Sequence, residues 1–333
     1  MEDAPMSDPI RWGVLGASNF ARKDMAPAIH AARGHVLAAL ATRSPQKAEP
    51  FAAIAPGLRV HVDYDALLAD PEIDAVYVPL PHTMHVDWGI KALEAGKHVL
   101  VEKPVAMSEA EIAPLIAARD RTGLQAAEAY MIVHHPQWAL VRDLLSDGAI
   151  GRLRHVEGVF TYDNSADPGN IRNAAAMGGG ALPDIGVYTY GCTRWATGAE
   201  PDAITHADIE WENGCDVLAR VSARFPGFTA HWVNSMRLLP EQFMLFHGEA
   251  GLIRLATPFN AARFGEASVD WRGRDGITHR RSWPGLDQYV LQVEAFGAAI
   301  RGEAPFPWTL ENAAGTQRVI DMAYAAAGGR PAV

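Results

Sequence analysis

Short apolar runs alternate with helical patterns over residues 10–130, and this alternation limits the possible fold more than any other feature of the sequence. Strands are predicted at Ile10–Leu15, His35–Ala41, Leu58–Val62, Ala75–Val78, 97–103 and Gln125–Tyr130. Strands that alternate with helices build a parallel sheet covered on both faces. We therefore predict an α/β fold in which residues 9–130 form a doubly wound Rossmann domain and residues 1–8 a flexible N-terminus.

The pattern changes after Tyr130. A helix, a strand, a long polar loop, three glycines and another helix occupy residues 136–198, and alternating segments separated by turns fill residues 203–283. Such alternation is typical of an antiparallel sheet. Because 333 residues exceed what one α/β core needs, we predict a second α/β domain over residues 131–333, with an open, largely antiparallel sheet and a cleft between the two domains.

The charge of the chain argues against one class of partner. A net charge of -10 without a basic stripe disfavours nucleic-acid binding, which requires a positive surface. No run approaches the roughly 18 apolar residues of a membrane span, and the first residues lack the features of a signal peptide. We expect a soluble, cytoplasmic protein in which Cys192 and Cys215 are ordinary buried thiols.

The segment Gly16-Ala17-Ser18-Asn19-Phe20-Ala21 follows the first strand and opens a helix. Small residues at such a turn let the backbone approach a pyrophosphate, which the N–H groups of the helix start can bind. Gly16 and Ala21 match the first and third positions of a dinucleotide-binding fingerprint, whereas Ser18 stands where a second glycine is usual. The segment is predicted to bind a dinucleotide, and a purely structural turn is the competing interpretation.

Thr42, Arg43, Ser44 and Lys47 follow the second strand, where an NAD-specific site usually carries an acid for the ribose 2′-hydroxyl. No acid stands at this point in the sequence, and an arginine can accommodate a 2′-phosphate. The helix dipole disfavours positive charge in a first turn, which favours a functional reason for Lys47. These residues predict NADP rather than NAD, with a solvated arginine and lysine as the alternative.

A loop rich in proline and histidine follows the fourth strand. It contains Pro79, Leu80, His82 and His85, and we expect it to touch the nicotinamide ribose because ligands bind beyond the carboxyl ends of parallel strands. The two histidines are three residues apart, but no carboxylate or further histidine stands at ligand spacing in the sequence. No metal site is predicted.

The next strand ends in Glu102-Lys103-Pro104. A proline cannot continue the ladder, so Lys103 is expected at the rim of the sheet, where an ammonium can take part in chemistry. Asp184 and Tyr188 are four residues apart and would share one helix face. Removing hydride from a carbinol requires a base for the hydroxyl proton, and an adjacent ammonium favours the phenolate form of a tyrosine. A surface lysine, a core tyrosine and a first-turn carboxylate are the alternatives.

The polar loop before the glycines supplies candidates for the wall of a substrate site. Arg172 and Asn173 can donate paired hydrogen bonds to sugar hydroxyls, although a solvated loop explains them nearly as well. His135 and Tyr162 are weaker candidates, and Trp232 is expected to pack in the sheet.

The order Gly16-x-x-x-x-Ala21, Glu102-Lys103-Pro104 and Gly178-Gly179-Gly180-x-x-x-Asp184-x-Gly186-x-Tyr188 resembles that of the Gfo/Idh/MocA oxidoreductases. Within that family the chain looks similar to the branch of NADP-dependent D-xylose 1-dehydrogenases and dimeric dihydrodiol dehydrogenases. The resemblance implies a homodimer formed through the C-terminal sheet. An arginine common in this branch is replaced by Val133, so we expect the pocket wall to differ there.

The resemblance also implies roles for individual residues. Lys103 would lie beside the nicotinamide, with Glu102 helping to place it and a cis peptide between Lys103 and Pro104. Asp184 would be the substrate-side acid. Tyr188 would transfer the proton, in a position where many relatives carry histidine.

The leading hypothesis is NADP-dependent oxidation of an aldose, of the D-xylose or D-glucose type, at its anomeric carbon to give a lactone. Alternatives among enzymes are a dihydrodiol or polyol dehydrogenase and an aldose oxidoreductase that keeps NADP tightly bound. A non-enzymatic NADP-sensing regulator is the alternative of another class.

Overall fold

The structure is a computed structural model that describes residues 8–331. Most of the expected N-terminal segment 1–8 therefore lies outside the described residues. The chain forms two compact units. The first contains the residues up to Ala106, Ala110–His134 and Asp287–Glu311, and the second contains Met107–Glu109, His135–Leu286 and the residues from Asn312 onward.

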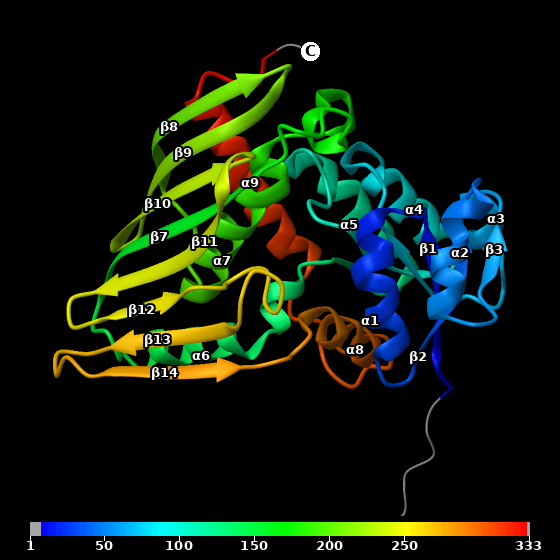
Figure 1. The fold of residues 1–333 in the computed structure, drawn as a ribbon, viewed down its shortest axis with the longest axis horizontal. Helices are drawn as coiled ribbons and strands as arrows, with labels where there is room; N and C mark the ends of the chain where they lie inside the picture. The colour runs from blue at the N-terminus through cyan, green and yellow to red at the C-terminus, as the bar shows by residue number, and fades with distance from the viewer. Residues whose placement is uncertain (1–7, 332–333) are drawn as a thin grey trace, which may run out of the picture. The chain divides into compact units, whose positions relative to one another are not determined.

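The described part of the first unit contains one sheet of six parallel strands (Figure 1). The strands are β1 (Ile10–Leu15), β2 (His35–Ala41), β3 (Arg59–His61), β4 (Ala75–Val78), β5 (His98–Val101) and β6 (Ala126–Glu128). Their order across the sheet is β3-β2-β1-β4-β5-β6, which reverses direction at β1. In such sheets ligands bind beyond the carboxyl ends of the strands, near the point of reversal. The predicted doubly wound sheet is confirmed.

Helices connect these strands as the sequence pattern predicted. A π-helical turn (Ala21–Met25) leads into α1 (Ala26–Ala31), and the remaining helices are α2 (Pro45–Ile54), α3 (Tyr64–Leu68), α4 (His85–Glu94), α5 (Ile112–Thr122) and α8 (Gln288–Ile300). Short 3-10 turns at His82–Met84 and Glu109–Glu111 precede α4 and α5, and a third, Met131–His134, follows β6.

The segment Asp287–Glu311 packs with the first unit, although it lies within the range expected for the second domain. The ring of Phe296 on α8 packs at a tilt against Trp12 of β1, 5.5 Å away, and Trp308 stacks at 4.2 Å from Tyr130. These contacts join residues that are far apart in the sequence. Local apolar patterns carry no information about such pairings, so the sequence could not place this segment.

The second unit contains an eight-stranded sheet within the described residues. Its strands are β7 (Leu153–Asp163), β8 (Ala203–Glu212), β9 (Cys215–Phe225), β10 (Phe228–Ser235), β11 (Arg237–Gly248), β12 (Leu252–Leu255), β13 (Ala267–Arg272) and β14 (Thr278–Trp283). The order is β14-β13-β12-β11-β7-β10-β9-β8, and every neighbouring pair is antiparallel except β7 with β10. The predicted largely antiparallel sheet is confirmed.

Helices α6 (Pro136–Ser146), α7 (Val187–Thr197) and α9 (Leu310–Ala326) lie along one face of this sheet (Figure 1). The buried indole of Trp232 on β10 donates to the hydroxyl of Thr193 on α7 at 3.0 Å. Thr189, one turn earlier, donates to Asn234 at 3.2 Å. These bonds hold α7 in a fixed rotation over the sheet.

Strand β11 begins at Arg237, before the part of its sequence in which apolar and polar residues alternate clearly. The alternation is clear only from Glu241, because Leu238, Leu239 and Pro240 are exposed and do not alternate. The register shifts between Arg237 and Glu241, which is the signature of a bulge or a similar irregularity. Such an irregularity accommodates a proline within a strand.

Candidate functional site

The turn after β1 requires glycine. Gly16 has φ of +101°, and a Cβ atom there would approach a side-chain carbon of Leu80 to 3.1 Å. Its amide donates to the carbonyl of Ala41 at the end of β2. The turn is therefore tied to both neighbouring loops at the carboxyl edge of the sheet.

Ser18 has a structural role at the position where the fingerprint usually has its second glycine. Its hydroxyl accepts a hydrogen bond from the amide of Ala21 at 3.0 Å, so the side chain caps the start of the first helix. Asn19 is exposed, whereas the ring of Phe20 packs edge-on against Tyr289 at 5.6 Å. Ser18 and Phe20 thus have structural contacts in addition to their predicted place beside a dinucleotide.

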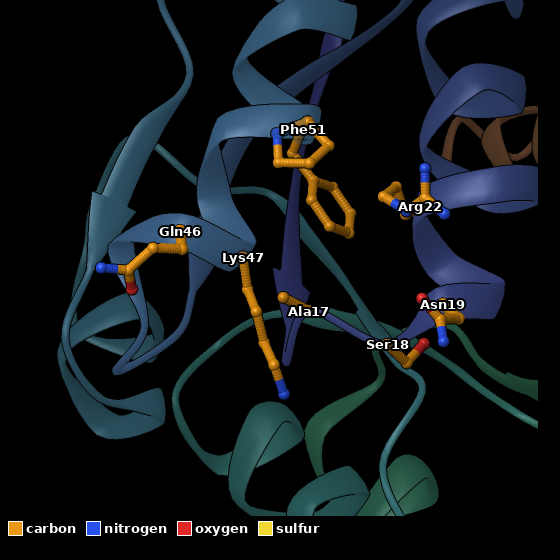
Figure 2. A pocket seen from close by; sticks show the side chains of 8 residues that line it. Ala17, Ser18, Asn19, Arg22, Gln46, Lys47 and Phe51 are labelled. Atoms are coloured by element: carbon orange, nitrogen blue, oxygen red, sulfur yellow. The ribbon is translucent and has the colours of Figure 1, made fainter.

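A cavity of about 520 Å³ lies at the carboxyl ends of β1 and β2. It brings together five residues predicted to bind the cofactor, namely Gly16, Thr42, Arg43, Ser44 and Lys47. Its other walls come from Ala17, Val62, Asp63, Tyr64, Asp65 and Trp88. A second cavity of about 340 Å³ is lined by Ala17, Ser18, Asn19, Arg22, Gln46, Lys47, Pro50 and Phe51 (Figure 2).

The loop after β2 presents its polar side chains by a short run of local hydrogen bonds. The hydroxyl of Thr42 accepts from the amide of Ser44 at 3.2 Å. The hydroxyl of Ser44 accepts from the amide of Lys47 at 3.4 Å and caps α2. Lys47 extends from α2 toward the turn after β1 (Figure 2). Because the loop is capped in this way, Arg43 and Lys47 project from an ordered backbone.

Lys103 lies in a buried turn that follows β5. Its backbone amide donates to Oε2 of Glu102 at 3.1 Å, and the hydroxyl of Tyr77 donates to Oε1 of the same carboxylate. The Lys103–Pro104 peptide is cis, as the resemblance implied. Only 8 % of Lys103 is exposed. Glu102 thus holds the backbone from which the lysine projects.

His85 joins this turn to the loop after β4. One ring nitrogen lies 2.8 Å from the carbonyl oxygen of Pro104, and the other lies 2.8 Å from that of Leu80. Burial lowers the pKa of His85 to about 4, so the ring is neutral at pH 7 and donates to one of the two carbonyls. Its predicted companions Pro79, Leu80 and His82 are buried in the same loop.

These histidines do not form part of a metal cluster. His82 lies 5.6 Å from His85 between ring centroids. Among residues 8–331, no group of three or more histidine, cysteine, aspartate or glutamate side chains is arranged to hold a metal ion.

Glu128, at the end of β6, is a third support that the sequence did not single out. Its carboxylate accepts from the amide of Val105 at 2.9 Å and from the indole of Trp308 at 2.8 Å. Burial raises the pKa of Glu128 to about 7. A buried acid in an otherwise apolar strand was the available signal, but its partner Trp308 could not be identified from local sequence.

In the second unit, Asp184 is the centre of a polar cluster. Its Oδ2 atom accepts from the hydroxyl of Tyr162 at 2.6 Å and pairs with Nε of Arg172 at 2.9 Å. Burial raises the pKa of Tyr162, with the charge of Asp184 acting in the same direction, so this phenol stays protonated. Asp184 in turn raises the pKa of Arg172. The structure thus brings together three of the predicted substrate-binding residues.

Tyr188 lies next to this cluster. Its ring packs against Phe160 at 5.6 Å and Phe259 at 5.7 Å, two rings that stack on each other at 4.9 Å, and only 6 % of the residue is exposed. Its phenol interacts electrostatically with Arg172. The predicted pair Asp184 and Tyr188 therefore shares one cationic neighbour.

Two other predicted substrate residues have structural contacts instead. The side-chain amide of Asn173 donates to the carbonyls of Asn164 and Asp167, and its oxygen accepts from Arg237. His135 is fully buried, and its Nδ1 accepts from the amide of Gln137 to cap α6. These contacts favour a role in holding the loop and the helix.

Asp216 fixes the start of the π-helical turn Leu182–Gly186, which carries Asp184 and leads into α7, and sequence reasoning missed it. This buried carboxylate accepts from the amide of Leu182 at 2.6 Å and from the hydroxyl of Tyr324 at 2.7 Å. Gly180 has φ of +137°, and a Cβ atom there would lie 2.0 Å from the carboxylate. Close packing against Asp216, rather than the flexibility expected of a glycine run, explains this glycine.

Comparisons with known proteins match both units. Residues 10–130 match the family model described as "Oxidoreductase family, NAD-binding Rossmann fold", and residues 138–254 match the GFO/IDH/MocA C-terminal domain.

Three relatives are informative about the chemistry of such chains. A dTDP-3,4-didehydro-2,6-dideoxy-alpha-D-glucose 3-reductase from Saccharopolyspora spinosa is 37% identical over 89% of each chain. A D-xylose 1-dehydrogenase (NADP(+)) from Haloferax volcanii is 30% identical over 96% of this chain and 97% of its own. A crystal structure of a 3-ketoreductase from Actinomadura kijaniata, in complex with NADP and TDP-benzene, matches with a TM-score of 0.87 and 32% identity, over 94% of this chain and 96% of that one.

Replacing Asp216 with asparagine is expected to change how stability depends on pH. Burial raises the pKa of Asp216 from 3.8 to about 6. The folded protein therefore binds this proton more tightly than the unfolded chain does. The resulting stabilisation is complete below about pH 4 and is lost as the pH rises through 6, an effect of about 3 kcal/mol at most. Urea unfolding between pH 4 and 7 measures the free energy of unfolding. In Asp216→Asn this free energy should fall less with rising pH than it does in the unmodified protein.

The control is Asp208→Asn, which changes a half-exposed aspartate on β8. It should leave the pH dependence of the unfolding free energy as in the unmodified protein. Equal pH slopes for Asp216→Asn and the unmodified protein would contradict the assignment.

Proposed function

Because this chain belongs to the GFO/IDH/MocA oxidoreductase family, with an NAD-binding Rossmann domain at residues 10–130, we propose that it is a sugar dehydrogenase of the CH–OH class. Its cofactor is NADP. The observation that carries the proposal is the buried turn around Lys103, which the side chains of Glu102, His85 and Glu128 hold in place at the carboxyl edge of the Rossmann sheet. A non-enzymatic NADP-sensing regulator would have no need of a lysine held in this way.

The predicted residues have distinct tasks in this proposal. When bound, NADP+ supplies the acceptor for the hydride. Residues of the Gly16–Ala21 turn, the Thr42–Lys47 loop and the Pro79–His85 loop hold the dinucleotide. Lys103 orients the reacting hydroxyl and stabilises the phenolate of Tyr188. Asp184 accepts hydrogen bonds from the other sugar hydroxyls, supported by Arg172 and Tyr162.

The proton and electron balance is simple. The substrate is an aldose of the D-xylose or D-glucose type in its ring form, reacting at C1. Tyr188 would accept the proton of the C1 hydroxyl, bound NADP+ would supply the acceptor for the hydride from C1, and the C=O bond that forms would give the lactone. Tyr188 then returns to the phenolate by losing that proton to solvent.

A second candidate is reduction of the keto group of a sugar joined to a nucleoside diphosphate. It is favoured by the 37% identity with the dTDP-sugar 3-reductase and by the likeness to a ketoreductase solved with TDP-benzene. The chemistry at Lys103 and Tyr188 is the same, with Tyr188 donating its proton. A polyol or dihydrodiol dehydrogenase uses these residues in the same way.

We also propose a cytoplasmic protein that forms a homodimer, with the outer face of the second sheet as the contact between its two copies. Val159 on β7 lies in register between Val233 on β10 and Phe243 on β11. Their neighbours Phe160, Trp232 and Met244 are buried. Side chains alternate along a strand, so the first three project from the opposite face, where they are half-buried. An apolar row on an open sheet is a candidate protein–protein contact.

Substrate class can be decided by a screen. We expect NADP+ to be reduced in the presence of D-xylose or D-glucose, which absorbance at the NADPH band measures. Activity with a trans-dihydrodiol alone, or NADPH oxidation with a nucleotide-linked ketosugar alone, would replace the aldose hypothesis with the corresponding alternative. No turnover with any of these compounds would favour the regulator.

Tyr188→Phe and Lys103→Met should each reduce kcat by about 10²- to 10⁴-fold, the usual contribution of general acid–base catalysis. Both variants should still bind NADP+, as titration calorimetry can verify. Tyr190→Phe is the matched control on the same helix, because the buried Tyr190 hydroxyl makes no hydrogen bond within the described residues. Full activity in Tyr188→Phe would show that Tyr188 takes no part in the proton transfer.

Phe243→Glu should convert the dimer into a monomer, because it places a charge in the middle of the proposed contact. Light scattering coupled to size-exclusion chromatography measures the mass. Ile277→Glu, at another exposed apolar residue of this unit, is the control and should remain dimeric. If Phe243→Glu has the same mass as the unmodified protein, the contact lies elsewhere.

A further inference from the structure

The smaller cavity of the first unit is lined by cations from two helices. Arg22 comes from the first helix and Lys47 from α2, and they enter the cavity from opposite sides (Figure 2). Asn19 and Gln46 add polar groups, while Pro50 and Phe51 form an apolar wall. Arg22 is half-buried and was not among the residues predicted from the sequence.

The two cavities differ in charge. The larger one is lined by Arg43 and Lys47 but also by Asp63 and Asp65, so its formal charges cancel. Among the described residues, the lining of the smaller one has two cations and no carboxylate. Several other arginines of this unit are paired with carboxylates, for example Arg11 with Asp74 at 2.8 Å and Arg59 with Asp70 at 3.0 Å. Within residues 8–331, neither Arg22 nor Lys47 forms an ion pair with a carboxylate.

The larger cavity has the surface that a nucleobase requires. The ring of Tyr64 meets that of Trp88 edge-on at 4.9 Å, and Val62 adds an aliphatic surface. Flat apolar and aromatic walls suit adenine, whereas a doubly charged group would meet two carboxylates there. Ala17 and Lys47 line both cavities, so a ligand can extend from one into the other.

We propose that the adenosine of NADP occupies the larger cavity and that its 2′-phosphate enters the smaller one, where Arg22 and Lys47 bind it. Arg22 is then the residue that discriminates NADP from NAD, beyond the Arg43, Ser44 and Lys47 set predicted from the sequence. This inference concerns the cofactor of the proposed enzyme and so deepens the proposed function.

The chemistry of the two cations supports this division of the site. A phosphate monoester carries between one and two negative charges near neutral pH. A guanidinium binds two of its oxygens through parallel N–H donors, and a lysine ammonium contributes a mobile point charge. Arg22 lies on an ordered helix whose first turn is capped by Ser18, so its position is defined before the ligand arrives.

The test is titration calorimetry of the full-length protein with NADP+, NAD+, 2′-AMP and 5′-AMP. Arg22→Ala should raise the Kd for NADP+ and 2′-AMP about 10- to 100-fold, and leave the Kd for NAD+ and 5′-AMP within about twofold. Arg22→Lys should recover part of the affinity for NADP+ and 2′-AMP that Arg22→Ala loses. Lys23→Ala, which removes the exposed cation next along the same helix, should change none of the four values.

Several outcomes overturn the inference. An unchanged Kd for NADP+ in Arg22→Ala places the 2′-phosphate elsewhere. If Arg22→Ala loses the same affinity for NADP+ and for NAD+, Arg22 supports the Gly16–Ala21 turn and does not bind the phosphate. These outcomes are separate from failure of the proposed function. If the protein binds NADP+ as described but oxidises or reduces no sugar, the inference about Arg22 stands and the proposed enzyme activity is refuted.

Discussion

The turn at residues 102–105 depends on three hydrogen-bonding side chains, of which His85 and Glu128 are buried and Glu102 is half-buried, and the proposed chemistry depends on that turn. Glu102 binds the amide of Lys103, His85 meets the carbonyl of Pro104, and Glu128 binds the amide of Val105. His85 belongs to α4 and Glu128 to β6, whereas Glu102 lies within the turn itself. A buried amide or carbonyl without a partner costs about 1–3 kcal/mol, so losing any one support disfavours the observed backbone. The position of Lys103 is thus set by its surroundings.

The second unit orders its polar cluster by a similar principle. Asp216 binds the amide of Leu182 at the start of the helical segment, and Trp232 binds Thr193 near its end. Asp184 and Tyr188 lie between these two anchors. Their side chains therefore project from a segment with little freedom, which is the pre-organisation that a binding site for a small polar ligand requires.

Much of this architecture follows from local sequence. The parallel sheet, its order of strands and helices, and the glycine turn at Gly16 could be predicted because apolar runs and turn residues act over a few positions. Glu102 was expected to help place Lys103, but the support from Glu128 could not be predicted, since Glu128 bonds to Trp308, which lies 180 residues later. Arg22 was missed because no motif marks it, and its significance comes from the cavity it shares with Lys47. Asn173 was predicted as a sugar ligand, but the loop uses its amide internally.

The central claim is that the turn after β5 presents Lys103 to the reacting end of the cofactor. A crystal structure of the protein with NADP+ and a substrate analogue tests it most directly. We expect the nicotinamide ring beside the turn, with Nζ of Lys103 about 3 Å from the oxygen of the analogue that corresponds to the reacting hydroxyl. A nicotinamide bound away from this turn, with Lys103 Nζ beyond hydrogen-bond reach of that oxygen, would contradict the account.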